Sequence, residues 1–209
     1  MFQRLQTIEL LGRANVIWQA LAWPGFEHVC VEAWSGAGGY TIDGLLVAVL
    51  GNEPSRVWYR IEVDDDWTFR SLNLRHTVEF SDDDDGPLDT EGQRLELVRT
   101  RDGIWDHDSD GAPADLTSCV DIDISVTPFT NSLPIRRLKL DIGATAEIDV
   151  VYVSVPQLAL ALAPQRYTRL DTSTYRFESL DSDFVADISV DQHSLVNDYP
   201  GLFRRVWSG

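Results

Sequence analysis

Apolar and polar residues alternate along much of this chain with the period of two that a half-buried β-strand requires. In residues 119–127 the aliphatic side chains fall on one face, and the other face carries Asp121, Asp123, Ser125 and Thr127. Similar alternation or short apolar runs recur in the segments 17–23, 26–34, 40–50, 57–63, 67–80, 94–100, 147–155, 167–179, 184–190 and 198–207.

Turn-forming residues separate these segments. Pro24-Gly25 is a strong turn dipeptide, and Asp102-Gly103 is typical of a tight hairpin. The pattern predicts about ten strands and no interior helix. Strands joined by short turns pair antiparallel, and a sheet of this size must curl, close or split. We therefore expect an all-β, mainly antiparallel protein whose sheet curls into a half-open roll or barrel, with at most short helices.

The length of the chain bounds its domain organisation. A chain of 209 residues is long enough for one well-buried domain and short for two, and no linker divides it. We therefore expect a single domain over residues 1–209. Apolar residues near the N-terminus recur at roughly helical spacing, so residues 1–16 form either a short helix or a loosely ordered lead-in.

The segment 129–140 has an unusual composition. It combines two prolines, an asparagine and the adjacent Arg136 and Arg137 with several aliphatic residues. It is too apolar for a solvated loop, and its prolines argue against a regular element. A guanidinium pair in apolar surroundings needs partners, and the nearest carboxylates include Asp121 and Asp123. The segment predicts a buried ion pair for at least one arginine, and the two should differ in role because neighbours on an extended chain face opposite ways.

An alternative interpretation places this segment at a ligand. Arg136 and Arg137 would bind a phosphate or carboxylate, and Thr130 and Asn131 would hydrogen-bond sugar hydroxyls at the polar end of an apolar pocket. Tryptophan and tyrosine stack on sugars and line lipid tunnels, although most fill ordinary β cores. Trp58 is the best exception because its strand neighbours are charged. The predicted ligand-binding residues are Thr130, Asn131, Arg136, Arg137, Trp58 and Tyr167.

The run Thr127 to Leu138 (TPFTNSLPIRRL) resembles the signature of a bacterial family described as "putative glycolipid-binding". The preceding Asp-x-Asp strand, the segments VPQL at 155–158 and QRYT at 165–168, and DYPGLF at 198–203 extend the resemblance over nearly the whole chain from Trp18. The resemblance implies a spiral β-roll similar to bacterial lipoprotein carriers. It also implies non-catalytic binding of an amphipathic lipid or glycolipid in the interior of the roll.

The charge of the chain bears on its partners. With 34 acidic and 17 basic residues, the formal net charge is −17, which argues against nucleic acid and against anionic membrane surfaces. No apolar run approaches the length that spans a bilayer, and the N-terminus lacks the pattern of a signal peptide. We expect a cytoplasmic protein without stable membrane insertion, and the oligomeric state stays open.

Motifs for metal binding and catalysis are weak. Residues 106–111 copy the start of a calcium loop, but Thr117 stands where the closing glutamate belongs. No Gly-x-Ser-x-Gly or His-Glu-x-x-His motif occurs, so no metal, cofactor or catalytic residue is predicted. Cys30 and Cys119 lie far apart in sequence and are expected as buried free thiols.

Three functions remain open. An apolar cavity that accepts an acyl chain, with Thr130 and Asn131 at its mouth, would favour binding of an amphipathic ligand. Two converging carboxylates, such as Asp121 and Asp123, would favour a hydrolase acting on a glycolipid. A solid core with an exposed apolar edge would favour a dimeric scaffold.

Overall fold

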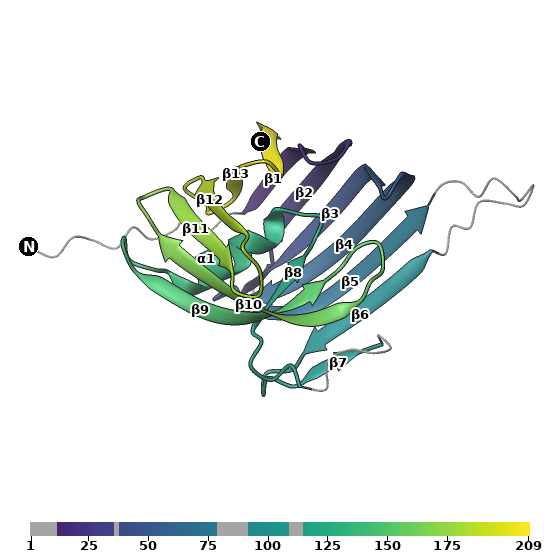
Figure 1. The fold of residues 1–209 in the computed structure, drawn as a ribbon. Coiled ribbons are helices and arrows are strands. Elements are labelled where there is room, and N and C mark those ends of the chain that lie inside the picture. Colours follow the sequence, from purple (N-terminus) through teal and green to yellow (C-terminus); the bar gives the residue numbers. More distant parts are fainter. Residues whose placement is uncertain (1–11, 36–37, 79–91, 109–114) are drawn as a thin grey trace, which may run out of the picture.

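A computed structural model describes residues 12–35, 38–78, 92–108 and 115–209. The described residues form fourteen strands, and all of them belong to one sheet (Figure 1). The strands are β1 (Arg13–Ala20), β2 (Gly25–Ala33), β3 (Gly39–Leu50), β4 (Glu53–Asp64), β5 (Phe69–Val78), β6 (Gln93–Arg99), β7 (Trp105–His107), β8 (Asp121–Ile124), β9 (Thr145–Val153), β10 (Leu160–Arg169), β11 (Thr174–Ser179), β12 (Val185–Val190), β13 (Val196–Tyr199) and β14 (Phe203–Ser208). The helix expected within residues 1–16 falls almost wholly outside the described residues.

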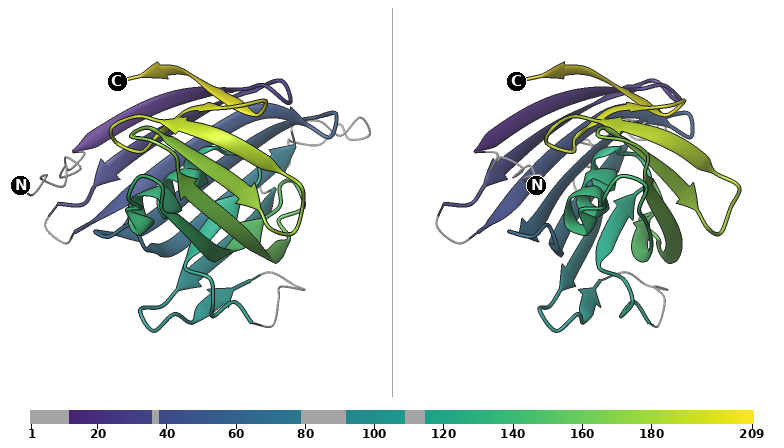
Figure 2. Two further views of the ribbon diagram at one scale, coloured as in Figure 1. Left: turned by 60° about the vertical axis from the view of Figure 1, so that its left-hand side comes forward. Right: turned by 90° about the vertical axis from the view of Figure 1, so that its left-hand side faces the viewer.

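The order of strands across the sheet is β7-β6-β5-β4-β3-β2-β1-β14-β13-β12-β11-β10-β9-β8. Every neighbouring pair is antiparallel except β8 and β9, which run parallel. Pairing of β1 with β14 brings the first and the last described strands together in the middle of the sheet. The sheet curls without closing into a barrel, so the predicted all-β, mainly antiparallel roll is confirmed (Figure 2).

The predicted count of about ten strands is too low. The segment 167–179, expected as one strand, contains the end of β10, a turn and the whole of β11. The tail expected at 198–207 likewise divides into β13 and β14 around a turn at Gly201, whose φ of 77° suits glycine. The strand expected from residue 67 begins two residues later because Trp67 occupies a turn with φ of 70°.

The segment 129–140 is helical, contrary to the irregular structure expected of it. A 3₁₀ turn (η1, Phe129–Asn131) leads directly into α1 (Ser132–Leu138). Pro134 is accommodated because it lies in the first turn of α1, where a backbone N–H has no intrahelical partner. The helix ends at Lys139, which adopts the left-handed conformation with φ of 47°.

Helix α1 lies inside the curl, between the wall formed by β1–β6 and the wall formed by β9–β12 (Figures 1 and 2). Together with η1 it covers the face of β8 that carries Asp121 and Asp123, so this strand is enclosed on both sides. Asp121 and Ile122 point in opposite directions, yet their exposed fractions are 0% and 1%. The polar residues of β8 therefore belong to the interior of the roll, where they require polar partners.

Candidate ligand-binding cavity

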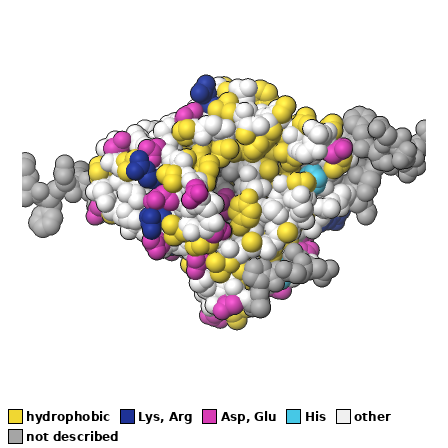
Figure 3. All heavy atoms as spheres, viewed as in Figure 1, with side chains coloured by type: hydrophobic (Ala, Val, Ile, Leu, Met, Phe, Trp, Pro, Cys, Tyr) yellow, Lys and Arg dark blue, Asp and Glu magenta, His cyan; other side chains and the backbone are white. Residues whose placement is uncertain are grey.

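A cavity of about 390 Å³ lies in the second half of the roll, within the size range of small-molecule sites. Its lining comes from β8, the turn that follows it, η1, the strands β9, β10, β11, β13 and β14, and the turns after β11 and after β13. The lining residues are Asp123, Ile124, Ser125, Thr127, Asn131, Tyr152, Ala161, Leu162, Ala163, Gln165, Phe177, Ser179, Asp181, Ser182, Phe184, Tyr199, Leu202 and Phe203. Figure 3 shows hydrophobic side chains gathered on the face of the molecule seen in Figure 1.

One end of the cavity is a hydrogen-bonded network centred on Asp123, which is half-buried and lines the cavity. Thr130 Oγ1 donates to Asp123 Oδ1 at 3.0 Å, and Gln165 Nε2 donates to Oδ2 at 2.7 Å. Tyr167 Oη donates to Asn131 Oδ1 at 3.0 Å and also contacts Gln165 Oε1 at 3.4 Å. The network fixes the two lining amides, Asn131 and Gln165, in single orientations beside the carboxylate.

The wall beside this network is aromatic. The Phe177 ring packs against Tyr167, Phe184 and Tyr199, with centroid separations of 5.4, 6.0 and 6.3 Å. Phe184 is 39% exposed and stands near the turn between β11 and β12, whereas Tyr199 is only 5% exposed. The cavity therefore runs from an apolar, partly exposed rim to a buried polar inner end.

Burial dominates the electrostatics of the inner end. It raises the pKa of Asp123, and the hydrogen bonds from Gln165 and Thr130 oppose that rise. It also raises the pKa of Tyr199, and the nearby charge of Asp123 adds to this effect. The charged lining residues are Asp123 and Asp181, and the lining contains no lysine, arginine or histidine.

A second buried carboxylate lies one hydrogen bond behind the lining. Thr127, which lines the cavity, donates from Oγ1 to Glu27 Oε2 at 2.9 Å. Tyr59 Oη donates to Glu27 Oε1 at 2.7 Å. Glu27 is fully buried, and desolvation raises its pKa to about 7. Glu27 was not among the residues predicted from the sequence, although it occupies an inward-facing position of β2.

The predicted residues Thr130, Asn131 and Tyr167 gather at the inner end. Asn131 lines the cavity, while Thr130 and Tyr167 support it from behind. Thr130 and Asn131 are 1% and 5% exposed, so their expected place at the mouth of the pocket is wrong. Helical structure from Phe129 onward turns both side chains inward, toward β8 and β10.

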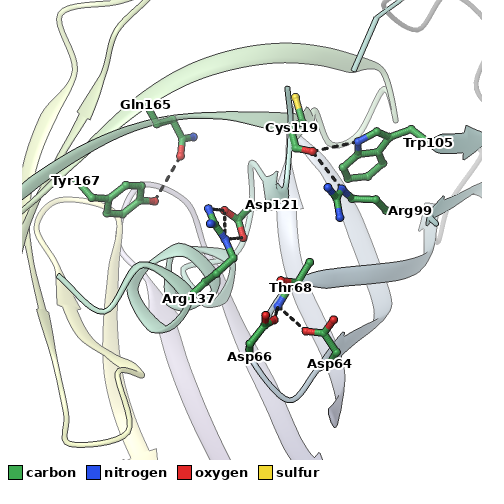
Figure 4. A network of polar contacts seen from close by, with 10 residues as sticks. All are labelled: Asp64, Asp66, Thr68, Arg99, Trp105, Cys119, Asp121, Arg137, Gln165 and Tyr167. Carbon is green, nitrogen blue, oxygen red and sulfur yellow. Dashed lines mark hydrogen bonds and ion pairs between the residues drawn. The ribbon is translucent and has the colours of Figure 1, made fainter. Parts of the chain in front are cut away.

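The two arginines of α1 serve different structural roles. Arg137 binds Asp121 through both Nε and Nη2, with a shortest separation of 2.6 Å (Figure 4). This contact confirms the predicted buried ion pair. Arg136 stacks on the Trp67 ring at 4.0 Å from its centroid and donates to the His193 carbonyl, and burial lowers its pKa to about 10. Neither arginine lines the cavity.

Trp58 lies on the other face of the sheet from the cavity. Its strand neighbour Tyr59 points inward, whereas Trp58 packs beside Arg60 and Arg75 and donates to Asp43 at 3.3 Å. A hollow beside it is lined by Leu45, Arg56, Trp58, Arg75 and Thr77. All five come from one face of three neighbouring strands, so this hollow lacks the opposing wall that encloses the interior cavity.

Figure 4 also shows how the edges of the sheet meet. Arg99 on β6 and Trp105 on β7 both donate to the carbonyl of Cys119, just before β8, at 3.2 Å. We call this contact between Arg99, Trp105 and Cys119 the seam. It joins the two edges of the sheet by side chains where the described strands form no ladder.

In the part of the chain that the structure describes, the metal-binding motif and the cysteines considered in the sequence do not contribute to the cavity lining. Within the described residues no group of three or more histidine, cysteine or acidic side chains could hold a metal ion, and the candidate calcium loop lies partly outside them. Cys119 is buried and Cys30 half-buried, and both are free thiols. No helix among the described residues is long and apolar enough to cross a membrane.

Comparisons with known proteins give the following findings. A family model described as "Putative glycolipid-binding" matches residues 15–205. The crystal structure of a DUF1089 family protein from Pseudomonas aeruginosa is 32% identical, aligns over 98% of this chain and 100% of its own, and has a TM-score of 0.73. A β-barrel-like DUF1849 protein from Brucella abortus is 8% identical over 97% of this chain and 99% of its own, with a TM-score of 0.46. No curated protein matches the sequence.

Proposed function

The chain belongs to the family described as putative glycolipid-binding, and we propose that it binds one amphipathic lipid or glycolipid molecule in the interior cavity without transforming it. The observation that carries the proposal is the cavity itself. It combines an aromatic wall around Phe177 with a fixed hydrogen-bonding end at Asp123, Asn131 and Gln165. That combination suits a molecule with an apolar part and a hydroxylated part.

The apolar wall is large enough to support binding. Burying one methylene contributes about 0.8 kcal/mol, so eight of them would contribute about 6 kcal/mol before ordering costs. Before those costs, that energy would correspond to a dissociation constant on the order of tens of micromolar, and the costs weaken binding from that value. Hydrogen bonds at the inner end would then add affinity and orient the ligand.

Features of the cavity argue against the two alternative functions, a dimeric scaffold with a filled core and a hydrolase. A scaffold with a filled core would leave no such volume. A hydrolase that uses paired carboxylates needs them to face each other across the substrate. Asp121 is held by Arg137, and both oxygens of Asp123 accept hydrogen bonds from Thr130 and Gln165. Such fixed acceptors suit recognition of hydroxyl groups.

The test is displacement of an uncharged, environment-sensitive fluorescent acyl probe. The variant Ala163→Trp places a large side chain at a lining position, whereas Ala22→Trp adds the same side chain at an exposed position outside the lining. We expect Ala163→Trp to abolish probe binding and Ala22→Trp to retain it, with both variants folded by thermal melting. Equal probe binding by the two variants, or no binding to the unmodified protein, would contradict the proposal.

A further inference from the structure

Resting on this proposed function, we propose that the inner end of the cavity takes an uncharged, hydroxyl-bearing head group and excludes phosphate or sulfate heads. In this arrangement one hydroxyl of the ligand donates to the Asp123 carboxylate and accepts from Tyr199 Oη. The apolar part of the ligand then extends past Phe177 toward the rim at Phe184.

The first argument is the charge of the lining. Its two charged residues, Asp123 and Asp181, are both acidic, and no cationic side chain lines the cavity. Nearby arginines are bound elsewhere: Arg137 pairs with Asp121, and Arg166 pairs with Glu147 and Glu178. A phosphate in the cavity would face a carboxylate without a counterion, an arrangement that costs free energy at low dielectric.

The second argument is the unused acceptor capacity of Asp123. Each carboxylate oxygen can accept about two hydrogen bonds, and each has one from the described residues, from Thr130 or Gln165. No arginine or lysine among the described residues pairs with this carboxylate. Its remaining lone pairs therefore favour a donor from the ligand, and a sugar hydroxyl is such a donor.

The third argument is the hydroxyl of Tyr199. Tyr199 as a residue is only 5% exposed, and its Oη makes no hydrogen bond with the described residues. Oη is also not one of the buried polar atoms that lack a partner, so it is accessible from the cavity and free to donate to a ligand. The residue lines the cavity, and its ring is held by Phe177 and Phe184. Asp123 is close enough for its charge to contribute to the raised pKa of Tyr199, after burial.

The two groups together define the chemistry that they recognise. The Asp123 carboxylate can accept a further hydrogen bond from a ligand, and Tyr199 Oη can donate one to a ligand. A single hydroxyl can satisfy both groups because it donates and accepts at once. An ionised phosphate or sulfate oxygen only accepts, so it could use Tyr199 but would be repelled by Asp123. The pair therefore favours a neutral sugar or polyol head.

Three compounds with the same alkyl chain separate the contributions of head and chain. Octyl glucoside carries a neutral sugar, octyl phosphate carries an anionic head, and 1-octanol supplies the chain with one hydroxyl. Each is titrated against the uncharged acyl probe, the two surfactants below their micellar concentrations and 1-octanol below its solubility limit. We expect octyl glucoside to displace the probe at about tenfold lower concentration than octyl phosphate, equivalent to about 1.4 kcal/mol.

Tyr199→Phe and Tyr175→Phe form a matched pair of variants. Tyr175 lies on β11, separated by β12 from the strand of Tyr199, is also 5% exposed and does not line the cavity. We expect Tyr199→Phe to weaken octyl glucoside binding about five- to tenfold relative to the unmodified protein, because one hydrogen bond is lost. Tyr175→Phe should leave this affinity unchanged.

The outcomes separate this inference from the proposed function. If none of the three compounds displaces the probe from the cavity, the proposed function and the inference both fail. If octyl phosphate displaces it as well as octyl glucoside does, lipid binding stands and the charge selection is wrong. If Tyr199→Phe and Tyr175→Phe bind octyl glucoside with the same affinity, the bridging hydroxyl is wrong.

Discussion

Tyr59 on β4 reaches across β3 to donate a 2.7 Å hydrogen bond to Glu27 on β2. The crossing point is Gly44, where a Cβ atom would lie 2.1 Å from the tyrosine Cζ. Thr127, on the turn after β8, completes the arrangement by donating to the other oxygen of Glu27. Residues 100 positions apart in sequence thus hold one buried carboxylate and connect the first half of the roll to the cavity lining.

Glu27 should make the stability of the protein depend on pH. Desolvation raises its folded-state pKa from 4.5 to about 7, so the unfolded chain releases this proton at lower pH than the folded protein does. The associated stability is fully present below pH 4.5 and is lost as pH rises toward 7, by about 3 kcal/mol in total. Glu27→Gln should remove this loss and unfold at higher denaturant concentration than the unmodified protein at pH 8.

The measurement is chemical denaturation of both proteins between pH 4 and pH 8. Other buried acids, such as Asp121 and Asp123, titrate in both proteins, so the difference between the two curves isolates Glu27. A difference that stays constant over this range would show that Glu27 does not carry a raised pKa.

Gly44→Ala should destabilise the fold through the same contact. The tyrosine ring cannot retreat easily because its hydroxyl is bound to Glu27, so the added methyl group should cost about 1–3 kcal/mol. Gly12→Ala is the matched control because a Cβ there meets no atom within 4 Å. Combining Gly44→Ala with Tyr59→Leu should cost less than the sum of the two single changes. Additive costs in denaturation midpoints would contradict the steric explanation.

The sequence predicted the sheet because period-two alternation is a local property of each strand. The alternation also places Glu27 on the inward-facing side of β2, together with Val29 and Val31. The sequence pattern does not reveal the two hydrogen-bond donors to the Glu27 carboxylate, because Tyr59 and Thr127 approach it only when the sheet curls. For a similar reason, the alternation of β8 does not reveal that a helix covers its acidic face, although the arginine pair predicted a carboxylate partner there.

Helix α1 and the aromatic wall of the cavity were not predicted from the sequence, for different physical reasons. Pro134 was taken to break regular structure, but its position in the first turn makes it compatible with a helix. Phe177 and Tyr199 come from separate hairpins and meet Asp123 only through the curl of the sheet. Asn131 and Tyr167 were among the predicted residues, and the structure joins them by a hydrogen bond.

Arg137→Ala should destabilise the protein more than Arg136→Ala. Loss of Arg137 leaves the fully buried Asp121 carboxylate without its cation, which typically costs about 3–5 kcal/mol. Arg136 contacts no carboxylate and its Nε has no partner among the described residues, so its removal loses stacking on Trp67 but also relieves a buried charge. Thermal melting and denaturant midpoints of the two variants test this order.

A double variant provides the control for this ion pair. Asp121→Ala together with Arg137→Ala should cost less than the sum of the single substitutions, because neither charge is then buried alone. An Arg136→Ala variant as unstable as Arg137→Ala would show that the stacked cation, and not the ion pair, holds α1 in place.

The thiol of Cys119 should report opening of the seam. Burial raises its pKa to about 11, and the thiolate is the form that reacts with iodoacetamide, so Cys119 should resist alkylation in the native protein at pH 8. Cys30, which is half-buried, should react first, and denaturant should make both thiols reactive.

Trp105→Phe removes one of the two donors to the Cys119 carbonyl and should therefore speed labelling of Cys119 but not of Cys30. Mass spectrometry of peptides at timed intervals measures both rates, and Trp207→Phe, at a 51% exposed position, is the control. Native labelling of Cys119 as fast as that of Cys30 would mean that the two edges of the sheet are not held together in solution.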